Sequence, residues 1–340
     1  NDIFMPAIYK VGDRLKKLSQ QYLGYPVMGR THFQPASPTT FGKIFAIYLA
    51  RLTQSLERLF AVKLQVKING AVGNYNSFMS AYPELDWINY SKYLAKQVNF
   101  SSFLWTDQRG PHNDVVRLFQ SLQEIGNILR DLSADLSYYA GLGLMYFSKV
   151  ESHVGSSVMP HKINPWFAEI AEGSLRRANA LINGLSNDLD VSRLQRDLSD
   201  HEWERSYGEM FGYIYVAIDH LQIALDMLNV DTEYAKQELN NHPEIVTEAL
   251  QTILRKHNIA DAYNIFKTAF RGGKVTSDDL NNFINQIEIS GEIKKELKNA
   301  TDPKKYIGLA PELARSAINY YEDFKQLSVS PFVDVADQWK

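Results

Sequence analysis

Three short polar segments hold the residues whose types and spacing suit chemistry. The first, at 30–40, places His32 among threonines and two prolines. An imidazole titrates near neutral pH, so His32 is a candidate general acid; the alternative is an ordinary surface histidine. The prolines exclude a helix here, and Thr39 or Thr40 is a candidate cap for the helix that follows.

The second segment, at 155–165, reads GSSVMPHKINP. Its glycine and serines favour mobility, and Lys162 brings a cation close to the start of the next helix. The free N–H groups of a helix N-terminus add positive field, so the segment suits a carboxylate or a phosphate. Glu169, one turn inside that helix, is a candidate partner for Lys162 or a histidine. The alternative is a flexible linker with a good cap at Asn164-Pro165.

The third segment, SRLQRDLSD at 192–200, leads into Arg205. Arg193, Arg196 and Arg205 lie close together in the chain, and guanidinium groups bind phosphate bidentately. The segment is therefore a candidate phosphate site, and the alternative is a solvated charged loop.

Long helices are expected to position these segments. Apolar residues recur at alternating steps of three and four, the spacing of one helical face. The pattern predicts five long helices in residues 1–229, packed side by side as a bundle. Their approximate ranges are 8–22, 45–59, 111–149, 171–189 and 203–228. Shorter helical patterns predict a smaller helical domain at 230–325, and 326–340 is expected to be an irregular tail. The predicted fold class is all-α.

The stretch at 41–49 is apolar on more than one helical face. A helix that is apolar all round is buried all round, which favours burial against other subunits. The alternative is cover from the C-terminal region of the same chain.

Composition excludes several classes of protein. The 340 residues include 36 Lys+Arg and 39 Asp+Glu, a net charge of −3, which is unlike a strongly basic nucleic-acid binder. The absence of cysteine excludes a disulfide scaffold and a thiolate site. It fits a reducing cytoplasm, the expected location, but does not by itself establish a compartment. No apolar run reaches the roughly 18 residues of a membrane span. His153 and His161 lack the spacing of a ligand pair on one helix face, so no metal is expected.

In this order between helices, the motifs resemble the fumarase/aspartase superfamily, and most closely its adenylosuccinate lyase family. Besides the three segments, KINGAVGNYN at 67–76 carries the resemblance, and histidine before Lys162 is typical of that family. The resemblance covers nearly the whole chain. It implies a homotetramer whose central helices form one bundle, with each active site assembled from three chains.

The implied reaction is a β-elimination that breaks a C–N bond and releases fumarate from a nucleotide substrate. No cofactor is implied. By resemblance, Ser156 is the base and His32 the general acid, and Ser157 is the alternative base if the register differs. The same resemblance places Thr31, Gln108, Lys162 and Asn164 on substrate, Arg196 and Arg205 at its phosphate, and Glu169 and His161 in support.

The chain departs from the family pattern at several positions. Phe33 stands where glycine is usual, Arg109-Gly110 replaces Ile-Glu, and His201 replaces a small hydroxyl residue before Arg205. An N-terminal domain of the family has no match, so that part is expected to precede Asn1. Two other hypotheses are therefore kept: another lyase or cycloisomerase of the superfamily, and a non-catalytic helical assembly derived from a lyase.

Overall fold

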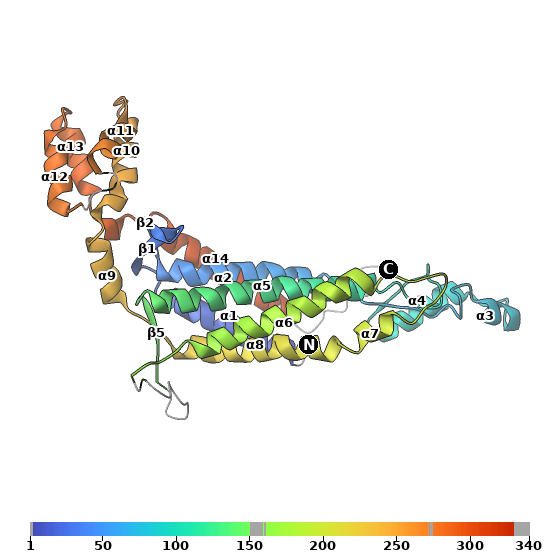
Figure 1. The fold of residues 1–340 in the computed structure, drawn as a ribbon. Helices are drawn as coiled ribbons and strands as arrows, with labels where there is room; N and C mark the ends of the chain where they lie inside the picture. Colours follow the sequence, from blue (N-terminus) through green and yellow to red (C-terminus); the bar gives the residue numbers. More distant parts are fainter. Residues whose placement is uncertain (1–2, 150–158, 160, 271, 273–274, 330–340) are drawn as a thin grey trace. The chain divides into compact units, whose positions relative to one another are not determined.

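The computed structural model describes residues 3–149, 159, 161–270, 272 and 275–329 (Figure 1). Within these ranges the five predicted long helices are present, which confirms the all-α fold class. They are α1 (Phe4–Gln21), α2 (Phe41–Phe60), α5 (Asn113–Gly141), α6 (Trp166–Asp188) and α8 (Tyr207–Met227). The side-chain oxygen of Thr40 accepts the backbone N–H of Lys43 at 3.1 Å, which confirms Thr40 as a cap of α2.

Helix α5 is shorter than the sequence predicts. It ends at Gly141 rather than near 149, and Gly143 follows with φ at 78°. Glycine adopts this left-handed conformation without a steric cost, and a helix commonly ends at such a residue. The chain then enters strand β5 (Met145–Phe147), which pairs antiparallel with β6 (Leu228–Val230).

The remaining elements are short, apart from the last helix. In the first two thirds of the chain they are β1 (Pro26–Thr31), β2 (Gln34–Thr40), β3 (Gln65–Val66), α3 (Asn76–Ala81), α4 (Trp87–Gln97), β4 (Ser101–Ser102) and α7 (Asp200–Glu204). The C-terminal part contains α9 (Thr232–Asn240), α10 (Thr247–Lys256), α11 (Ala262–Phe270), α12 (Ser277–Gln286), α13 (Gly291–Asn299) and α14 (Ala310–Val329), with 3₁₀ turns at Pro243–Val246 and Pro303–Lys305. Helix α14 extends to Val329, so it includes the first four residues of the predicted tail. In the described part of the chain, no helix has the length and apolar content to cross a membrane.

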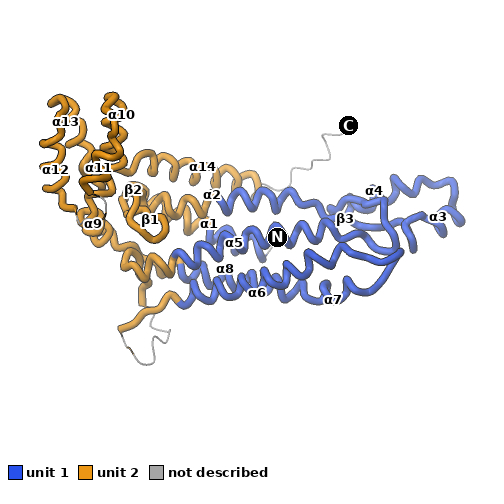
Figure 2. The backbone as a smooth tube through the Cα atoms, turned by 45° about the horizontal axis from the view of Figure 1, so that its top comes forward, with its two compact units in different colours: residues 1–11, 51–135, 166–224 blue, residues 12–50, 136–165, 225–340 orange. Residues whose placement is uncertain are grey.

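The chain divides into two compact units (Figure 2). Unit 1 comprises residues 1–11, 51–135 and 166–224, and unit 2 comprises 12–50, 136–165 and 225–340. In unit 1, α2, α5, α6 and α8 are joined by side-chain contacts. Asn179 of α6 donates to Asn127 of α5 at 2.8 Å, and Phe119 of α5 packs against Phe211 of α8 with ring centroids 5.3 Å apart.

Unit 2 joins α1 to α14 at a close approach. A Cβ atom at Gly12 would lie 2.6 Å from the Tyr321 hydroxyl oxygen, so only glycine fits beside this buried ring. Tyr321 and Lys325 both donate to the Asp13 carboxylate, at 3.1 and 2.7 Å. In the same unit, α10 to α13 enclose a separate apolar core.

The first polar segment is non-helical, as its prolines predict, and it forms a β-hairpin. Strands β1 and β2 pair antiparallel with Thr31 opposite Gln34, so His32 and Phe33 form the tip. Their φ angles are 53° and 60°, as a two-residue type I′ turn requires. The prolines did not prevent strand pairing, because a two-stranded hairpin leaves one edge of each strand without a ladder partner.

Three contacts attach the hairpin to the C-terminal helices within unit 2. Met28 of β1 is fully buried in the apolar core of α10 to α13. Arg30 donates to Glu238 of α9, and Ser37 of β2 donates to Glu248 of α10. The Ser37 hydrogen bond is the main cause of a lowered pKa at Glu248. The two strands that carry the hairpin tip are therefore anchored to the C-terminal helices.

The buried apolar stretch at the start of α2 is covered within the single chain. Phe41, Phe45 and Leu49 are fully buried without a second subunit. Ile47 is the partly exposed member of that stretch, at 45%. This arrangement favours cover from the same chain over burial against another copy.

The packing of α6 against Trp203, which positions α7, can be tested by a substitution at Gly184. A Cβ atom there would lie 2.1 Å from the ring of Trp203, whose indole N–H donates to Asp188 at 3.2 Å. We expect Gly184→Ala to displace Trp203 and lower the free energy of unfolding by about 1–3 kcal/mol, measured by chemical denaturation. Gly173→Ala, on the exposed side of the same helix where a Cβ meets nothing within 4 Å, should stabilise by up to about 1 kcal/mol. Equal effects at the two sites would contradict this packing.

The strain at the hairpin tip is testable by comparing two substitutions of Phe33. Phe33 is 70% exposed, and its ring packs edge-on against Tyr138 with centroids 5.7 Å apart. Both Phe33→Gly and Phe33→Ala remove the ring, but only glycine removes the steric cost of a positive φ. The glycine variant should therefore be more stable than the alanine variant by about 1 kcal/mol in thermal or chemical unfolding. An alanine variant of equal or greater stability would show that the tip is unstrained.

Candidate active site

A buried carboxylate organises the third polar segment. The Asp200 side chain is 2% exposed, and its Oδ2 accepts a hydrogen bond from Arg196 Nη1 at 2.7 Å. The guanidinium of Arg109 lies 3.4 Å from the same oxygen. Buried charges are stable only when they are paired, so each group depends on the others.

Arg109 also attaches this segment to the end of α6. Its side chain is 8% exposed, and the guanidinium donates to the backbone carbonyls of Leu189 and Val191, at 2.9 and 2.6 Å. The backbone N–H of Gln108 donates to the Gln195 carbonyl at 3.2 Å. The predicted substrate residue Gln108 and the predicted phosphate segment are thus brought together within unit 1.

His201 lies between an arginine and a glutamate. Its Nε2 is 2.9 Å from Arg196 Nη2, and its Nδ1 is 3.0 Å from Glu204 Oε2. A guanidinium can only donate, so Nε2 is the acceptor in this contact. In that tautomer the Nδ1–H donates a hydrogen bond to the Glu204 carboxylate. The two contacts together hold the orientation of the His201 ring between Arg196 and Glu204.

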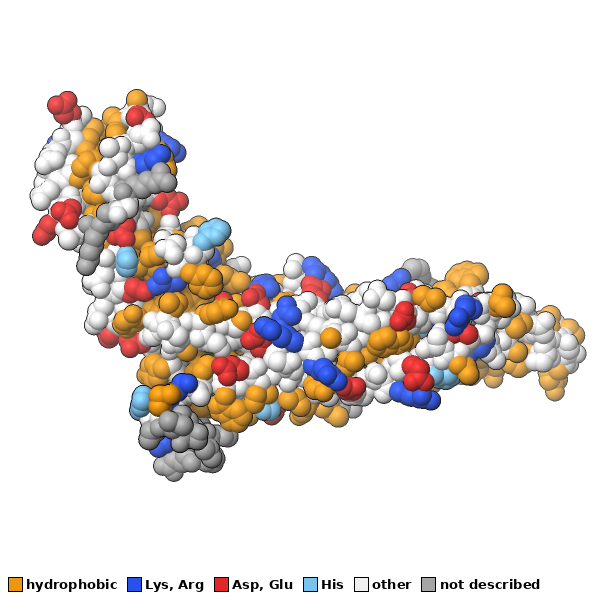
Figure 3. Space-filling model, in the orientation of Figure 1, with side chains coloured by type: hydrophobic (Ala, Val, Ile, Leu, Met, Phe, Trp, Pro, Cys, Tyr) orange, Lys and Arg blue, Asp and Glu red, His pale blue; other side chains and the backbone are white. Residues whose placement is uncertain are grey.

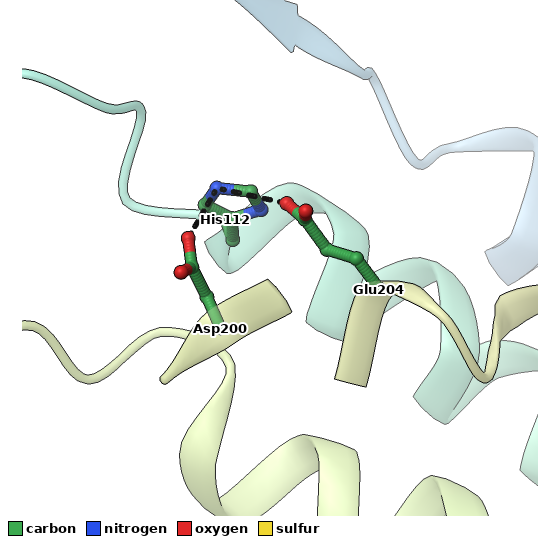
Figure 4. Close-up of side chains that lie close together, drawn as sticks. All are labelled: His112, Asp200 and Glu204. Atoms are coloured by element: carbon green, nitrogen blue, oxygen red, sulfur yellow. Dashed lines mark ion pairs between the residues drawn. The ribbon is translucent and has the colours of Figure 1, made fainter. Parts of the chain in front are cut away.

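His112, directly before α5, lies beside the same acidic groups (Figure 4). Its Nε2 is 3.9 Å from Asp200 Oδ2 and 3.9 Å from Glu204 Oε1. Burial, assisted by the charge of Arg109, lowers the pKa of His112 below its usual value of 6.5. The ring is therefore neutral at neutral pH, and the two contacts become ion pairs only on protonation.

Sequence reasoning missed the meeting of His112, Asp200 and Glu204, whose ligand atoms lie within 4.8 Å of one another. Such a trio has the donor types that hold a metal ion. Here, however, Arg109 and Arg196 already balance the charge of the two carboxylates. A divalent cation would lie among these like charges, so the geometry fits an ion-pair network better than a metal site.

The other two arginines of the segment are paired as well. Arg193 Nε lies 3.6 Å from Asp197, and Arg205 donates to Glu202 at 2.6 Å. Hydrogen bonds from Ser199, and then from the Arg193 backbone, lower the pKa of Asp197. Arg205 and Glu202 are both 73% exposed, so an anion from solvent can reach this guanidinium.

The motif at 67–76 has a structural role in this unit. Asn69 is buried, donates to the Leu104 carbonyl at 2.8 Å and accepts from the Thr106 hydroxyl at 2.8 Å. Gly73 has φ at 85°, and a Cβ there would lie 1.8 Å from the Thr106 carbonyl oxygen. These contacts fix the segment that precedes Gln108.

The other predicted site residues divide between the units. Thr31, His32, His161 and Lys162 are exposed in unit 2, where Asn164 is half-buried; Glu169 is exposed in unit 1, in the first turn of α6. Ser156 and Ser157 lie outside the described residues. A groove of about 560 Å³ in unit 1, lined in part by Arg58, Lys63 and Arg117, includes none of the predicted site residues.

Comparison with protein families divides the chain into two matched parts. Residues 1–179 match the family model "Lyase", and residues 192–307 match "Adenylosuccinate lyase C-terminal". Two solved structures share the fold: a 3-carboxy-cis,cis-muconate lactonizing enzyme from Pseudomonas putida and a fumarate lyase from Mesorhizobium sp. BNC1. The first has a TM-score of 0.76 at 20% identity, covering 95% of this chain and 73% of that one. The second has a TM-score of 0.75 at 21% identity, covering 94% and 72%.

Curated relatives are more similar in sequence. The adenylosuccinate lyase of Legionella pneumophila (strain Corby) is 36% identical over 92% of this chain and 69% of its own length. The adenylosuccinate lyase of Haemophilus influenzae is 35% identical over 92% and 68%. That of Escherichia coli K12 is 34% identical over 91% and 68%. The chain therefore belongs to the adenylosuccinate lyase family of the fumarase/aspartase superfamily.

Proposed function

We propose that the protein is a C–N lyase that cleaves adenylosuccinate to AMP and fumarate. The same elimination converts succinylated aminoimidazole carboxamide ribotide to its free carboxamide and fumarate, so the role lies in purine nucleotide biosynthesis. The observation that carries the proposal is identity of 34–36% to adenylosuccinate lyases over more than nine tenths of the chain. The arginine-rich segment supports it, because a nucleotide phosphate needs such cations.

The reaction removes a proton from the carbon beside a carboxylate and expels nitrogen from the neighbouring carbon. That proton is weakly acidic unless the developing aci-carboxylate is stabilised by nearby positive groups. In the proposal Ser156 takes the proton, with Ser157 as the adjacent alternative, and Lys162 and Asn164 hold the substrate carboxylates. The field of Lys162 and of the helix N-terminus is the proposed source of serine ionisation.

His32 is the proposed donor of a proton to the leaving nitrogen. The hairpin supports this role, since it places an exposed imidazole at a tip whose strands are anchored by Met28, Arg30 and Ser37. Thr31, beside it, is a proposed substrate contact. A general acid must be held within hydrogen-bond reach of its target, and a fixed tip suits that need.

The remaining predicted residues complete the substrate site. Gln108 contacts substrate, and Arg196 and Arg205 bind its phosphate. Glu169 and His161 act in support of the segment at 155–165. No cofactor has a place in this scheme, because the elimination needs an acid, a base and stabilisation of an anion.

We further propose a homotetramer with active sites shared between copies. Helix α8 supports this, because its exposed face carries Gly208, Phe211, Gly212, Tyr215 and Val216. Their spacing follows one helical stripe, and a Cβ at either glycine meets nothing within 4 Å, which leaves room for a close partner helix. Hydrophobic side chains gather along the lower edge of Figure 3, over α8. A cytoplasmic location and a domain boundary at 229/230 remain part of the proposal, whereas α14 continues across the predicted boundary at 325/326.

The activity is tested by incubating the full-length protein with adenylosuccinate and measuring fumarate. Ser156→Ala should abolish turnover while substrate binding remains. His32→Asn, which suits the positive φ of the tip, should lower kcat by about 10²- to 10⁴-fold because it removes the acid. His242→Gln serves as a control, since His242 pairs with Glu244 and is not among the proposed site residues.

Three outcomes would contradict parts of the proposal. Absence of fumarate from a correctly folded tetramer would refute the activity, and retained nucleotide binding in that case would support a non-catalytic assembly. Near-normal turnover by Ser156→Ala with loss in Ser157→Ala would move the base to Ser157. Normal kcat in His32→Asn would remove His32 from the acid role.

A further inference from the structure

A buried ion pair lies close to the tip of the β1–β2 hairpin. Arg30 of β1 donates to the Glu238 carboxylate of α9, and the two side chains are 16% and 13% exposed. One strand pair, Thr31 with Gln34, lies between this contact and the turn that carries His32. The ion pair is therefore placed where it can fix the turn.

The pair lacks the hydrogen bonds that would make it a strong stabiliser. Nε of Arg30 and Oε2 of Glu238 are both buried, and neither has a hydrogen-bond partner among the residues that the structure describes. Buried polar atoms without partners lower stability, and a buried ion pair is often no more stable than apolar side chains of the same volume. Buried polar and ionic groups are better attested as devices that fix the register of two elements. The pair thus suits fixing the position of β1 on α9 better than adding stability.

Apolar packing holds the same strand against the same helix. Met28, two residues before Arg30, is buried in a core that includes Leu239, the residue after Glu238. Apolar contacts are not directional, so they leave β1 able to shift by small amounts. The charged contact is directional, because a guanidinium presents its N–H groups in a rigid fork. Together the two contacts make the position of the hairpin tip depend on α9.

A second carboxylate contacts the hairpin but differs in exposure. Glu248 of α10 accepts from Ser37 of β2 and from the Tyr306 hydroxyl, the latter at 2.9 Å. Both contacts are exposed, so water can replace either hydrogen bond. Ser37 also lies three positions beyond Gln34, further from the turn. The buried contact at Glu238 is therefore the one with the stronger control of the tip.

We propose that Glu238 is a positioning residue for His32, the proposed general acid, and this inference rests on the proposed function. The carboxylate holds Arg30, and Arg30 fixes the end of β1 from which the turn projects. His32 is thereby held where its proton can reach the leaving nitrogen. Glu238 exchanges no proton with the substrate and acts only through Arg30 and the strand.

Loss of the Glu238 charge should affect turnover more than substrate binding. Proton donation requires hydrogen-bond reach, and a misplacement of about 1 Å can lower a rate by about 100-fold. In Glu238→Gln the guanidinium loses its charged partner, and the tip is no longer fixed. We expect kcat to fall by about 10- to 100-fold, with a smaller change in KM.

The kinetic test uses the full-length protein and adenylosuccinate. Glu238→Gln is measured alone and in combination with His32→Asn. If Glu238 acts through His32, the kcat of the double variant should equal that of His32→Asn alone. Glu233→Gln, which breaks an exposed pair with Lys236 on the same helix, is the matched control and should keep the wild-type kcat.

Two further measurements keep the test decisive if Glu238→Gln folds poorly. Arg30→Met combined with Glu238→Leu removes both buried charges, so this protein should fold as stably as the wild type. Because it restores packing but not the directional contact, it should retain the loss in kcat. Hydrogen exchange of residues 26–40, which needs no activity, should be faster in both Glu238 variants and unchanged in Glu233→Gln.

The positioning role and the proposed function fail by different results. Wild-type kcat in Glu238→Gln or in the apolar double variant would overturn the positioning role alone, since fumarate is then still released. Unchanged hydrogen exchange at 26–40, or an equal loss of kcat with and without His32, would overturn it as well. Absence of fumarate release by the folded wild-type protein would overturn the proposed function and the positioning role together. A loss of kcat that requires His32, with faster exchange in the hairpin, would establish the role of Glu238.

Discussion

The buried carboxylate of Asp200 is the interaction on which the third polar segment depends. One oxygen faces the guanidinium groups of Arg196 and Arg109, and the side chain is 2% exposed. Because Arg109 also donates to two carbonyl groups after α6, the carboxylate links three separate stretches of chain. Removal of one partner from a buried pair leaves the other charge uncompensated, so these groups hold the segment as a set.

Paired arginines give the site a particular electrostatic character. Arg193, Arg196 and Arg205 each have a carboxylate partner in the same segment. A phosphate therefore competes with acidic side chains rather than entering an empty positive field. The exposed pair of Arg205 costs little to separate, whereas the Arg196 pair with its buried carboxylate is strong. We infer that Arg196 is positioned in advance and that Arg205 adjusts to the ligand.

The sequence predicted the long helices because their apolar spacing is local information repeated over several turns. It did not predict the hairpin at 26–40, because the strands contain prolines and do not alternate strictly between polar and apolar residues. Met28 of this hairpin is buried among residues that lie about 200 positions further along the chain. The end of α5 at Gly141 was also missed, since apolar spacing continued beyond it. The left-handed conformation of Gly143 accompanies the end of the helix, and the apolar spacing does not reveal it.

The candidate site could be predicted only where its residues lie close together in the sequence. The arginines of 192–205 are close in sequence and could be recognised, and Asp200 and Glu204 are spaced to share a helix face. Their meeting with Arg109 and His112 depends on packing of α5 against its neighbours, which no local pattern contains. The one available signal was Arg109-Gly110, where the chain departs from its family.

The most direct test of this account is the free energy of unfolding of Asp200→Asn, compared with Glu202→Gln at the exposed pair with Arg205. If the buried carboxylate holds both arginines, the first variant should lose about 3–5 kcal/mol. The second should change by less than about 1 kcal/mol, as exposed pairs do. A loss at Asp200 no larger than that at Glu202 would contradict the central place given to this carboxylate.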